Sequence, residues 1–390
     1  MRILEVCPYD LDRPGGVQRH VMDLGSALAE AGHSVVILAP GDPLKSRQLL
    51  PGLRTFCIGG ASVFRLHGTA FEVTRASADE LALLLSMHND SPFDVVHFHA
   101  LWTPWLPWQV FRLLAGKRIR CVATFHDTPP SNWSGKLASG LFRVLSRYLS
   151  SYLDVAIAVS EAPAKHLWLA SRCSLRILPP CIDLRALSGP LPLPRQDPSL
   201  RILFIGRLEP RKGVLLLIQA FAQLRQRNQS AQLVICGDGE QAVEARALTE
   251  SLKLSGSICF TGGVDAAERN RLLSDADVFC APSPFGESYG LVLAEAMAVG
   301  LPVVAAANLG YRTVLCGTGA AGLTELGDVQ SLVTTLSLML ENLPLRERLA
   351  SWGRVEAQRS DVRQRLDEFV AILSPSPSPV GISRGGTGNA

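Results

Sequence analysis

The chain contains none of several motifs that would place it in a common class at once. It has no GxxxxGK[ST] phosphate-binding loop, and none of its nine cysteines forms a CxxC pair. It also has no long basic run and no array of basic and aromatic residues, so nucleic-acid binding is not indicated. Only 19% of the residues are charged and 6% are aromatic, whereas 47% are hydrophobic and the net charge is +3. This composition is typical of a soluble globular protein.

The chain also has no long uninterrupted apolar run. The longest apolar region, residues 290–310, contains Glu295, Gly300 and Pro302, so we expect no transmembrane helix. Residues 1–6 are predicted to form a first strand and not a signal peptide. Several cysteines lie in strand-like runs, which indicates buried, reduced thiols in a cytoplasmic protein. The mild positive charge would suit anionic substrates or anionic lipids but proves neither.

What the chain does have is an alternation of short apolar runs and helical periodicity. Residues 2–7 form an apolar run, residues 17–31 have helical spacing and residues 34–39 form the next apolar run, which together predict a βαβ unit. Further strands are predicted along the chain at 94–99, 120–125, 155–159, 200–205, 232–236, 257–260 and 276–280. Because these strands are almost entirely apolar, we expect parallel sheets covered on both faces.

The length of 390 residues favours two domains. Four prolines between residues 188 and 199 predict an extended linker. We therefore predict two doubly wound α/β domains, residues 1–187 and 200–354, that face each other across a cleft. A helix at about 355–373 follows, and the Ser-, Pro- and Gly-rich tail 374–390 is predicted to be disordered. In sheets of this kind, ligands bind beyond the carboxyl ends of the strands.

One stretch, residues 285–304, combines a glycine-punctuated loop, an apolar helix and a buried strand. Gly286 and Gly290 would let the backbone approach a ligand closely, and a helix N-terminus with free N–H groups is a ready anion site. Gly300 stands where the helix should end, and Pro302 prevents its continuation. The stretch is predicted to hold a sugar nucleotide.

Charged residues in this stretch and in an earlier loop support that prediction. Glu287 and Glu295 could be a glycosidase carboxylate pair or acceptors for ribose and sugar hydroxyls, and Glu295 could also be a solvated surface charge. The loop 206–213 follows a predicted strand and carries Arg207, Arg211 and Lys212 between two glycines. Such a junction would suit a pyrophosphate, with a solvated basic turn as the alternative.

Histidines and aspartates supply further candidates. His97 and His99 form an HxH pattern, which can bind a metal ion, but no third ligand is evident nearby in the sequence, so packing is favoured. His126, at the end of the next strand, could bond a sugar hydroxyl or a phosphate, or be satisfied within its loop. The DxD patterns at 10–12 and 275–277 are assigned to turn or helix-end roles.

Aromatic residues after a strand leave three interpretations open. Trp102, Trp105 and Trp108 could line an acceptor site, rest on a membrane interface or pack under a loop. The predicted helix 137–152 is amphipathic and basic, which permits membrane contact, although packing on the first sheet is favoured. We assign four loop residues to the acceptor side: Tyr9, Gln18, His99 and Trp102.

Together these segments resemble the retaining glycosyltransferases of family 4, which have the GT-B architecture of two Rossmann-like domains facing across a cleft. The resemblance covers residues 1–355, and its most specific part is the E-x7-E element from Glu287 to Glu295. Residues 1–21 and 123–126 are especially similar to phosphatidylinositol mannosyltransferases. Those lipid enzymes carry a basic helix near 70–85, where this chain has Arg75 as its one cation. The chain also has Pro-Pro-Cys-Ile-Asp at 179–183, where the family often has Pro-Asn-Gly-Val-Asp.

The resemblance implies roles for individual residues. Arg207 and Lys212 would clasp the donor pyrophosphate, Glu295 would take the ribose hydroxyls and Glu287 the sugar ring. His126 would contact the transferred sugar, and a catalytic set would comprise His126, Arg207, Lys212 and Glu287. Gly16 would let its loop approach the β-phosphate. Five further residues would hold sugar and phosphate: Ser288, Tyr289, Gly290, Leu291 and Val292. The family usually needs no metal ion or cofactor, and its last helix crosses back onto the first domain.

We therefore expect a retaining glycosyltransferase that moves a hexose from a nucleoside diphosphate sugar to a lipid-linked or glycan acceptor, in polysaccharide or glycolipid biosynthesis. GDP-mannose is the first choice of donor, with UDP-sugars next. Peripheral contact with the anionic inner face of the plasma membrane is an open option. The alternatives are a non-catalytic glycan- or membrane-binding protein on the same scaffold and a sugar-nucleotide epimerase.

Overall fold

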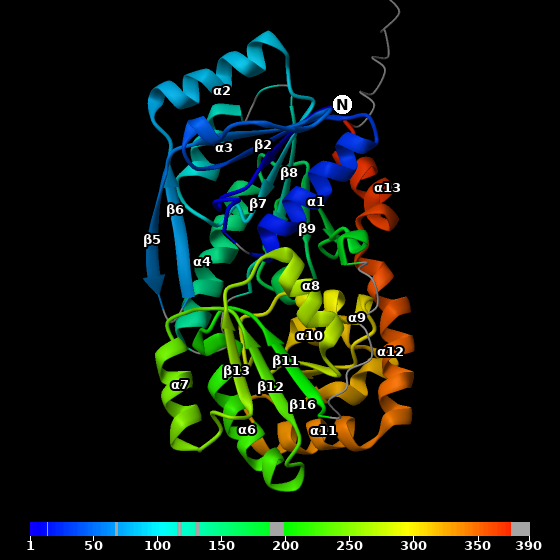
Figure 1. Cartoon of the computed structure of the whole chain (residues 1–390). Coiled ribbons are helices and arrows are strands. Elements are labelled where there is room, and N and C mark those ends of the chain that lie inside the picture. Colours follow the sequence, from blue (N-terminus) through cyan, green and yellow to red (C-terminus); the bar gives the residue numbers. More distant parts are fainter. Residues whose placement is uncertain are drawn as a thin grey trace, which may run out of the picture.

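The computed structural model describes residues 1–13, 15–66, 69–114, 117, 119–128, 133–187 and 199–375. Two α/β domains lie one above the other in Figure 1. The N-terminal domain contains β1 (Arg2–Val6), α1 (Gly16–Glu30), β2 (Ser34–Pro40), β3 (Gln48–Leu50), β4 (Leu53–Ile58), β5 (Gly60–Leu66), β6 (Thr69–Arg75), α2 (Ala78–Asp90), β7 (Val95–His99), α3 (Leu106–Leu114), β8 (Arg120–Phe125), α4 (Trp133–Leu149), β9 (Val155–Ala158), α5 (Glu161–Ala164) and β10 (Ser174–Ile177).

The C-terminal domain is built on the same alternation. It contains β11 (Arg201–Ile205), α6 (Val214–Arg227), β12 (Gln232–Cys236), α7 (Ala242–Ser251), β13 (Ile258–Gly262), α8 (Ala266–Asp275), β14 (Val278–Ala281), α9 (Leu291–Ala298), β15 (Val303–Ala306), α10 (Leu309–Val314), β16 (Leu323–Thr324), α11 (Val329–Glu341) and α12 (Leu343–Ala357). A last helix, α13 (Val362–Leu373), follows.

Both sheets are essentially parallel. The N-terminal sheet has the strand order β10-β9-β8-β7-β1-β2-β4-β3, in which the edge strand β3 runs antiparallel to β4. The C-terminal sheet has the order β13-β12-β11-β14-β15-β16. The prediction of two doubly wound α/β domains is therefore confirmed.

Apolar side chains cover both faces of the N-terminal sheet, as its almost entirely apolar strands require. On β1, Leu4 points into a cluster with α2, α3 and α4, whereas its neighbour Ile3 points into a cluster with α1 and α13. Successive residues of a strand face opposite sides, so one strand serves both layers.

The last helix completes the second of these layers. Val362, Phe369 and Leu373 of α13 are buried in the cluster that contains Val21 and Leu24 of α1. The Arg120 side chain of β8 donates a hydrogen bond of 2.8 Å to the carbonyl of Ile372. In Figure 1, α13 lies beside α1 and belongs in space to the upper domain, although α12 belongs to the lower one. The chain therefore crosses between the domains again near its end.

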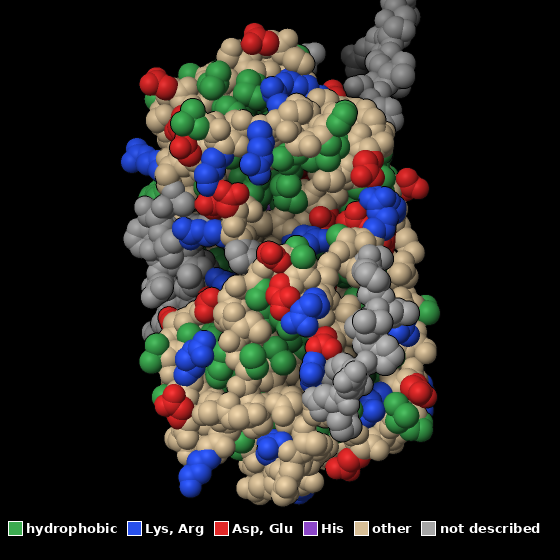
Figure 2. Space-filling model, viewed as in Figure 1, with side chains coloured by type: hydrophobic (Ala, Val, Ile, Leu, Met, Phe, Trp, Pro, Cys, Tyr) green, Lys and Arg blue, Asp and Glu red, His purple; other side chains and the backbone are tan. Residues whose placement is uncertain are grey.

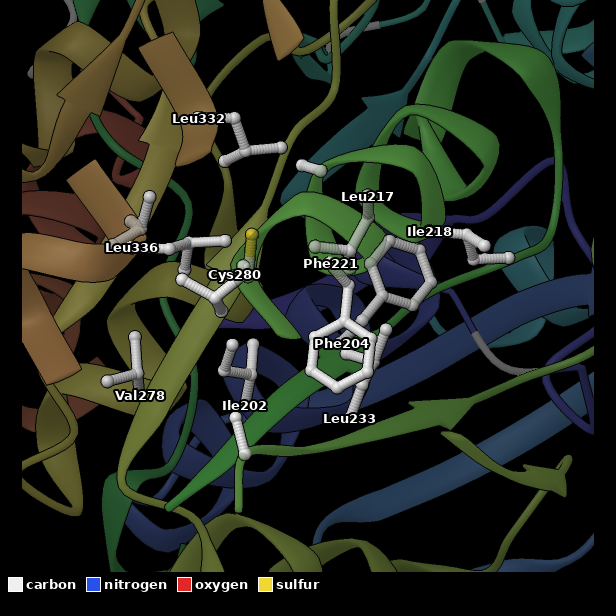
Figure 3. Close-up of a cluster of buried hydrophobic side chains, with 14 of the residues drawn as sticks. Ile202, Phe204, Leu217, Ile218, Phe221, Leu233, Val278, Cys280, Leu332 and Leu336 are labelled. Atoms are coloured by element: carbon white, nitrogen blue, oxygen red, sulfur yellow. The ribbon is translucent and has the colours of Figure 1, made fainter. Parts of the chain in front are cut away.

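The C-terminal sheet has its own core. Phe204 of β11 packs with Leu217 and Phe221 of α6, and Leu336 of α11 lies in the same cluster, as Figure 3 shows. The opposite face packs against α8, α9 and α10, through residues such as Leu293 and Tyr311. This second cluster also contains Ile182, which comes from the end of the N-terminal domain.

Some elements differ from the sequence-based prediction. A helix was predicted at about 355–373, but α12 extends to Ala357 and α13 starts at Val362. The two helices are separate because Asp361 caps α13 and Ile182 bridges to Asp361 between them. Residues 41–93 also form β3, β4, α2 and a separate antiparallel pair, β5–β6, which the sequence analysis did not predict. The predicted linker at 188–199 lies outside the described residues except for Ser199. The predicted disordered tail lies outside them except for residues 374 and 375.

Two other predictions can be compared directly with the structure. Seven of the nine cysteines are buried, as their positions in strand-like runs indicated. Within the described residues, no helix is both long enough and apolar enough to cross a membrane.

Candidate functional site

The loops that follow strands β8, β9 and β14 meet between the two domains. Thr128, after β8, shares a hydrogen bond of 2.8 Å with Ser288, after β14. The hydroxyl of Ser160, after β9, donates to the Ser288 carbonyl. The carboxyl ends of strands from both sheets therefore face the same space, and Figure 2 shows a hollow between the upper and lower domains there. This is the cleft that the sequence predicted.

The N-terminus of α9 forms one wall of the cleft. Gly290 is its N-cap, with φ of 107°, and a Cβ atom there would lie 2.6 Å from the ring of Tyr311. Only glycine fits this conformation and this contact. No side chain caps the helix, so N–H groups of its first turn are left for a ligand. The helix ends at Ala298, and Gly300 has φ of 83°, as predicted.

The N-terminus of α1 lies opposite. Gly16 is the first residue of α1, and a Cβ atom at Gly16 would lie 3.7 Å from the Leu291 side chain of α9. The two helix N-termini thus approach each other from different domains. Both present the partial positive charge that favours a phosphate group.

Three cations of the loop after β11 lie beside α9. Lys212 donates to Glu287 over 2.5 Å, and Arg211 bonds the same Glu287 oxygen over 3.3 Å. Arg211 also donates to Glu209 over 2.9 Å, and Arg207 pairs with Glu209 over 3.0 Å. The solvated basic turn is therefore not what forms here, because Arg211 and Lys212 are largely buried, with side chains 14% and 17% exposed.

Burial of these charges has an electrostatic consequence. Burial lowers the pKa of Lys212, although the carboxylate of Glu287 opposes that shift. A buried ammonium group without a counter-ion would be strongly unfavourable. Glu287 therefore acts as the counter-ion that holds the cationic loop together.

Glu295 lies within α9, eight residues after Glu287 of the preceding loop. It is 5% exposed and pairs with Arg269 of α8. The interpretation of Glu295 as a solvated surface charge is therefore wrong. The Arg269 contact uses one carboxylate oxygen, Oε2.

On the N-terminal side, His126 and Asp127 follow β8. His126 is partly exposed, and its Nε2 lies 3.1 Å from Nδ1 of His99. Burial raises the pKa of Asp127 to about 6, against the opposing charge of Arg211. The influence of Arg211 on Asp127 means that the two domains share one electrostatic environment.

The residues assigned to the acceptor side do not form one surface. His99 is fully buried, and Trp102 is 7% exposed and packs against Phe125 and Phe142. The structure therefore places neither of them where an acceptor could touch it. Gln18 is partly buried and its amide bonds the Asp10 carbonyl over 3.4 Å. Tyr9 is partly exposed, and burial raises the pKa of its hydroxyl group.

Trp105 and Trp108 differ in their surroundings, so one interpretation does not fit both of them. Trp108 donates a hydrogen bond of 2.8 Å to the Leu101 carbonyl and is partly buried. Trp105 is 52% exposed. Only Trp105 therefore offers a large aromatic surface, and the cluster of three is not an exposed platform.

Two groups of potential metal ligands lie among the described residues. One consists of His20, His99 and His126, and the other of Glu5, His97 and His99, with ligand atoms within 4.8 Å of each other. Glu5 adds a possible third ligand from another strand, but His97 and His99 are both fully buried, so the packing that was favoured for them is confirmed. The two DxD patterns contain aspartates that bind other protein groups. Asp12 pairs with Lys45 over 2.5 Å, and Asp277 accepts a hydrogen bond of 2.8 Å from the Arg201 backbone.

Sequence reasoning gave no role to several residues that the cleft contains. Arg269 was not considered, because its helix position does not reveal that it reaches Glu295 of another helix. Asp127 and Thr128 were given no role either. Arg211 was named as a cation of the loop 206–213, but the family resemblance gave roles only to Arg207 and Lys212. The strand–loop–helix context of residues 206–213 was a signal for all three cations.

Comparison with known proteins agrees with this architecture. The model for Glycosyltransferase Family 4 matches residues 14–186, and the model for Glycosyl transferases group 1 matches residues 192–355. The chain is 33% identical over 371 residues to the phosphatidyl-myo-inositol mannosyltransferase of Mycobacterium tuberculosis, with 93% of each chain covered. The similarity to this group of enzymes that the sequence motifs predicted is confirmed.

Two solved structures show the same fold. Sucrose-phosphate synthase of Thermosynechococcus elongatus has a TM-score of 0.76 at 21% identity, covering 95% of this chain and 98% of that one. Anabaena Alr3699/HepE, in complex with UDP and glucose, has a TM-score of 0.75 at 19% identity, covering 96% and 99%. The GT-B fold prediction is confirmed.

The buried ion pair of Lys212 and Glu287 should be strongly coupled. In a double-mutant cycle of Lys212→Met and Glu287→Gln, measured by chemical denaturation, we expect a coupling free energy of about 2 to 3 kcal/mol. The exposed pair Arg271–Glu268, with contacts of 2.7 Å on one helix, is a matched control and should show no resolvable coupling. Equal coupling in the two cycles would contradict the account of Glu287 as the counter-ion of a buried cation.

Asp127 should make stability depend on pH. Its pKa is about 6 in the folded protein, whereas the ordinary value for an aspartate is 3.8, so the folded state binds the extra proton between these values. Ionised Asp127 therefore destabilises the fold increasingly as pH rises through this window. Asp127→Asn should be more stable than the wild type above pH 6, by no more than about 3 kcal/mol, with the gain lost below pH 4. Denaturant unfolding between pH 4 and 8 measures this, and a difference independent of pH would contradict it.

Proposed function

The chain belongs to the glycosyl transferases of group 1 and family 4, and from this we propose that it transfers a hexose, with retention of configuration, from a nucleoside diphosphate sugar to a hydroxyl group of a lipid-linked or glycan acceptor. GDP-mannose is the proposed donor, because a curated relative at 33% identity is a mannosyltransferase. The observation that carries the proposal is the buried set of Arg211, Lys212 and Glu287 beside the N-terminus of α9.

The proposed donor pose uses the two helix N-termini and the cationic loop. The diphosphate lies between Gly16 and the first turn of α9, and it replaces Glu287 as the partner of Arg211 and Lys212. Arg207 is more exposed than these two, at 45%, and would be a third cation for the diphosphate. Positive charge fixed in advance stabilises the diphosphate as it leaves, so the proposal needs no metal ion or cofactor.

The two glutamates take different parts of the donor. When Arg211 and Lys212 bind the diphosphate, Glu287 can accept hydrogen bonds from sugar hydroxyls. Glu295 uses Oε2 for Arg269, which leaves Oε1 for the ribose hydroxyls. His126 lies on the opposite wall and contacts the transferred sugar. The C1–O bond to the diphosphate breaks, a C1–O bond to the acceptor forms on the same face, and the acceptor hydroxyl proton passes to the leaving phosphate oxygen.

A thermal-shift panel tests the donor site. GDP and GDP-mannose should raise the melting temperature, with a stabilisation of about 2.7 kcal/mol at a ligand concentration 100 times Kd. Lys212→Ala should remove most of this shift, and Arg271→Ala, which lies on a surface helix, should keep it. Stabilisation by neither GDP nor UDP compounds would overturn the donor site. Stabilisation by UDP-sugars alone would overturn the choice of GDP-mannose.

Product analysis separates the alternative functions from the proposed one. A non-catalytic binding protein would show the thermal shift without any transfer of labelled mannose. An epimerase would change the sugar of the donor without an acceptor. The anomeric configuration of the product, measured by NMR, tests retention.

The proposed membrane contact uses α4. Leu141, Val144 and Tyr148 are spaced three and four residues apart, so they lie on one helix face, and their exposures are 65%, 63% and 59%. Arg143 and Arg147 are exposed beside them, and the α4 sequence contains no Asp or Glu. An apolar stripe flanked by cations without acidic residues suits an anionic lipid surface.

Two further observations favour α4 as the membrane contact over α2, which lies where the lipid mannosyltransferases carry a basic helix. Trp168, 52% exposed, lies 5.9 Å from the guanidinium carbon of Arg147 and extends the aromatic surface. By contrast, the first turn of α2 contains two acidic residues, Asp79 and Glu80. We therefore place the contact with the cytoplasmic face of the plasma membrane at α4.

Vesicle flotation tests this contact. The protein should float with vesicles of phosphatidylglycerol and phosphatidylcholine, and less with phosphatidylcholine alone. The triple variant Leu141→Ser, Val144→Ser, Tyr148→Ser should lose most of the binding. A control variant with Val243→Ser and Val355→Ser, which are exposed apolar residues of the C-terminal domain, should retain it. Equal flotation of the two variants would contradict the role of α4.

A further inference from the structure

A chain of hydrogen bonds leads from the interior of the N-terminal domain to His126. Glu5 of β1 and His99 of β7 are both fully buried, and Nε2 of His99 lies 2.7 Å from Oε2 of Glu5. The other nitrogen of His99, Nδ1, lies 3.1 Å from Nε2 of His126. Strands β1, β7 and β8 are adjacent in the sheet, so the three residues form a row across it.

The chemistry of Glu5 decides which nitrogen of His99 carries hydrogen. Oε2 of Glu5 lies between two imidazoles, because Nδ1 of His97 is 2.9 Å away on its other side. The far nitrogen of His97 is 2.7 Å from the Thr124 hydroxyl, which can donate to it and leave hydrogen on Nδ1. The contact with His97 does not have hydrogen-bond geometry, so the hydrogen bond of Oε2 is the one to His99. A carboxylate oxygen can only accept, and with Glu5 as a carboxylate His99 is the ring that donates. Neutral His99 therefore carries its hydrogen on Nε2.

The state of His99 in turn fixes that of His126. With hydrogen on Nε2, neutral His99 has a lone pair on Nδ1, and burial lowers its pKa and that of His126, so both rings are neutral. Nε2 of His126 must then donate to Nδ1 of His99, which leaves Nδ1 of His126 without hydrogen and with a lone pair. Among the described residues, no hydrogen bond of this Nδ1 is found, and the ring is partly exposed.

We propose that Glu5 is a positioning residue that acts through His99 to hold His126 in the Nε2–H tautomer, so that His126 offers a hydrogen-bond acceptor to a hydroxyl group of the substrate. The inference rests on the proposed function for the identity of that hydroxyl. Without Glu5, His99 can carry hydrogen on Nδ1 instead. His126 would then have to accept at Nε2 and would present a donor at Nδ1. One buried carboxylate thus selects whether the ring accepts from a hydroxyl or donates to it.

A third imidazole lies beside this row. The ring of His20 is 5.4 Å from that of His99 and 5.6 Å from that of His126, measured between centroids, and its Nδ1 lies 3.0 Å from the carbonyl of Cys181. The hydrogen-bond chain from Glu5 through His99 to His126 is here called the relay. A metal ion bound by His20, His99 and His126 would need nitrogen lone pairs of His99 and His126 that are engaged in the hydrogen bond between these two rings. The two arrangements therefore exclude each other, and a chelator distinguishes them.

The test is the tautomer of His126 in the full-length protein labelled with ¹⁵N-histidine. In the wild type, the two-bond ¹H–¹⁵N spectrum should show a protonated, pyrrole-type Nε2 and an unprotonated, pyridine-type Nδ1 for His126, assigned by the loss of its signals in His126→Gln. Glu5→Met removes the acceptor and should reverse this pattern. Glu5→Gln keeps an acceptor oxygen and should preserve it. Glu5→Met should also lower kcat at least about tenfold, with the KM for the donor nearly unchanged.

Several results would overturn the proposal. Hydrogen on Nδ1 of wild-type His126 would do so even if Glu5→Met failed to fold. An unchanged tautomer in a folded Glu5→Met variant would also overturn it, as would a wild-type spectrum that changes when EDTA is added. The tautomer is measured without substrate, so the result does not depend on whether the donor proposal is correct. If the relay is found but no nucleotide binds, the proposed function fails and the positioning of His126 by Glu5 holds.

Discussion

Parallel strands that are apolar on both sides must be covered on both faces, and the way in which this chain meets that requirement determines where its site lies. The N-terminal sheet has α2, α3 and α4 on one face, but α1 alone does not cover the other. The chain supplies the missing cover from its far end, where α13 brings Phe369 into the same cluster as Leu24. To reach that place, the backbone pairs Ile182 with Asp361, next to the first crossing between the domains. Two crossings close together hold the domains with the carboxyl ends of their strands face to face.

That arrangement creates an electrostatic requirement in the cleft. Two helix N-termini and three cations of the loop after β11 meet in a partly dehydrated space, and they need negative charge. Glu287 and Glu209 supply it, at 2.5 Å from Lys212 and 2.9 Å from Arg211. In the proposed donor pose a diphosphate replaces Glu287, because a diphosphate carries more charge than one carboxylate and suits helix N-termini. The internal ion pairs thus keep the cationic loop folded and ready for the donor.

The sequence predicted the parts of the molecule that depend on local pattern. The βαβ units follow from apolar runs and helical spacing, and the turn at Gly290 follows from glycine, whose φ of 107° suits no other residue. Contacts between distant segments could not be predicted in this way. Nothing in the spacing of Glu5, His99 and His126 shows that their strands are neighbours, and the helix break before Asp361 depends on Ile182. His99 and Trp102 were assigned to the acceptor side because they follow a strand. The sequence does not reveal that the packing of β7 and α3 buries both of them.

The central claim is that one donor molecule is held by both domains, between the N-terminus of α1 and that of α9. Hydrogen exchange of the backbone amides, followed by mass spectrometry with and without GDP-mannose, tests this most directly. The account predicts slower exchange in two separate segments, residues 15–18 and residues 288–292, and loss of both effects in Lys212→Ala. Protection confined to the C-terminal segment, or protection of neither, would contradict it.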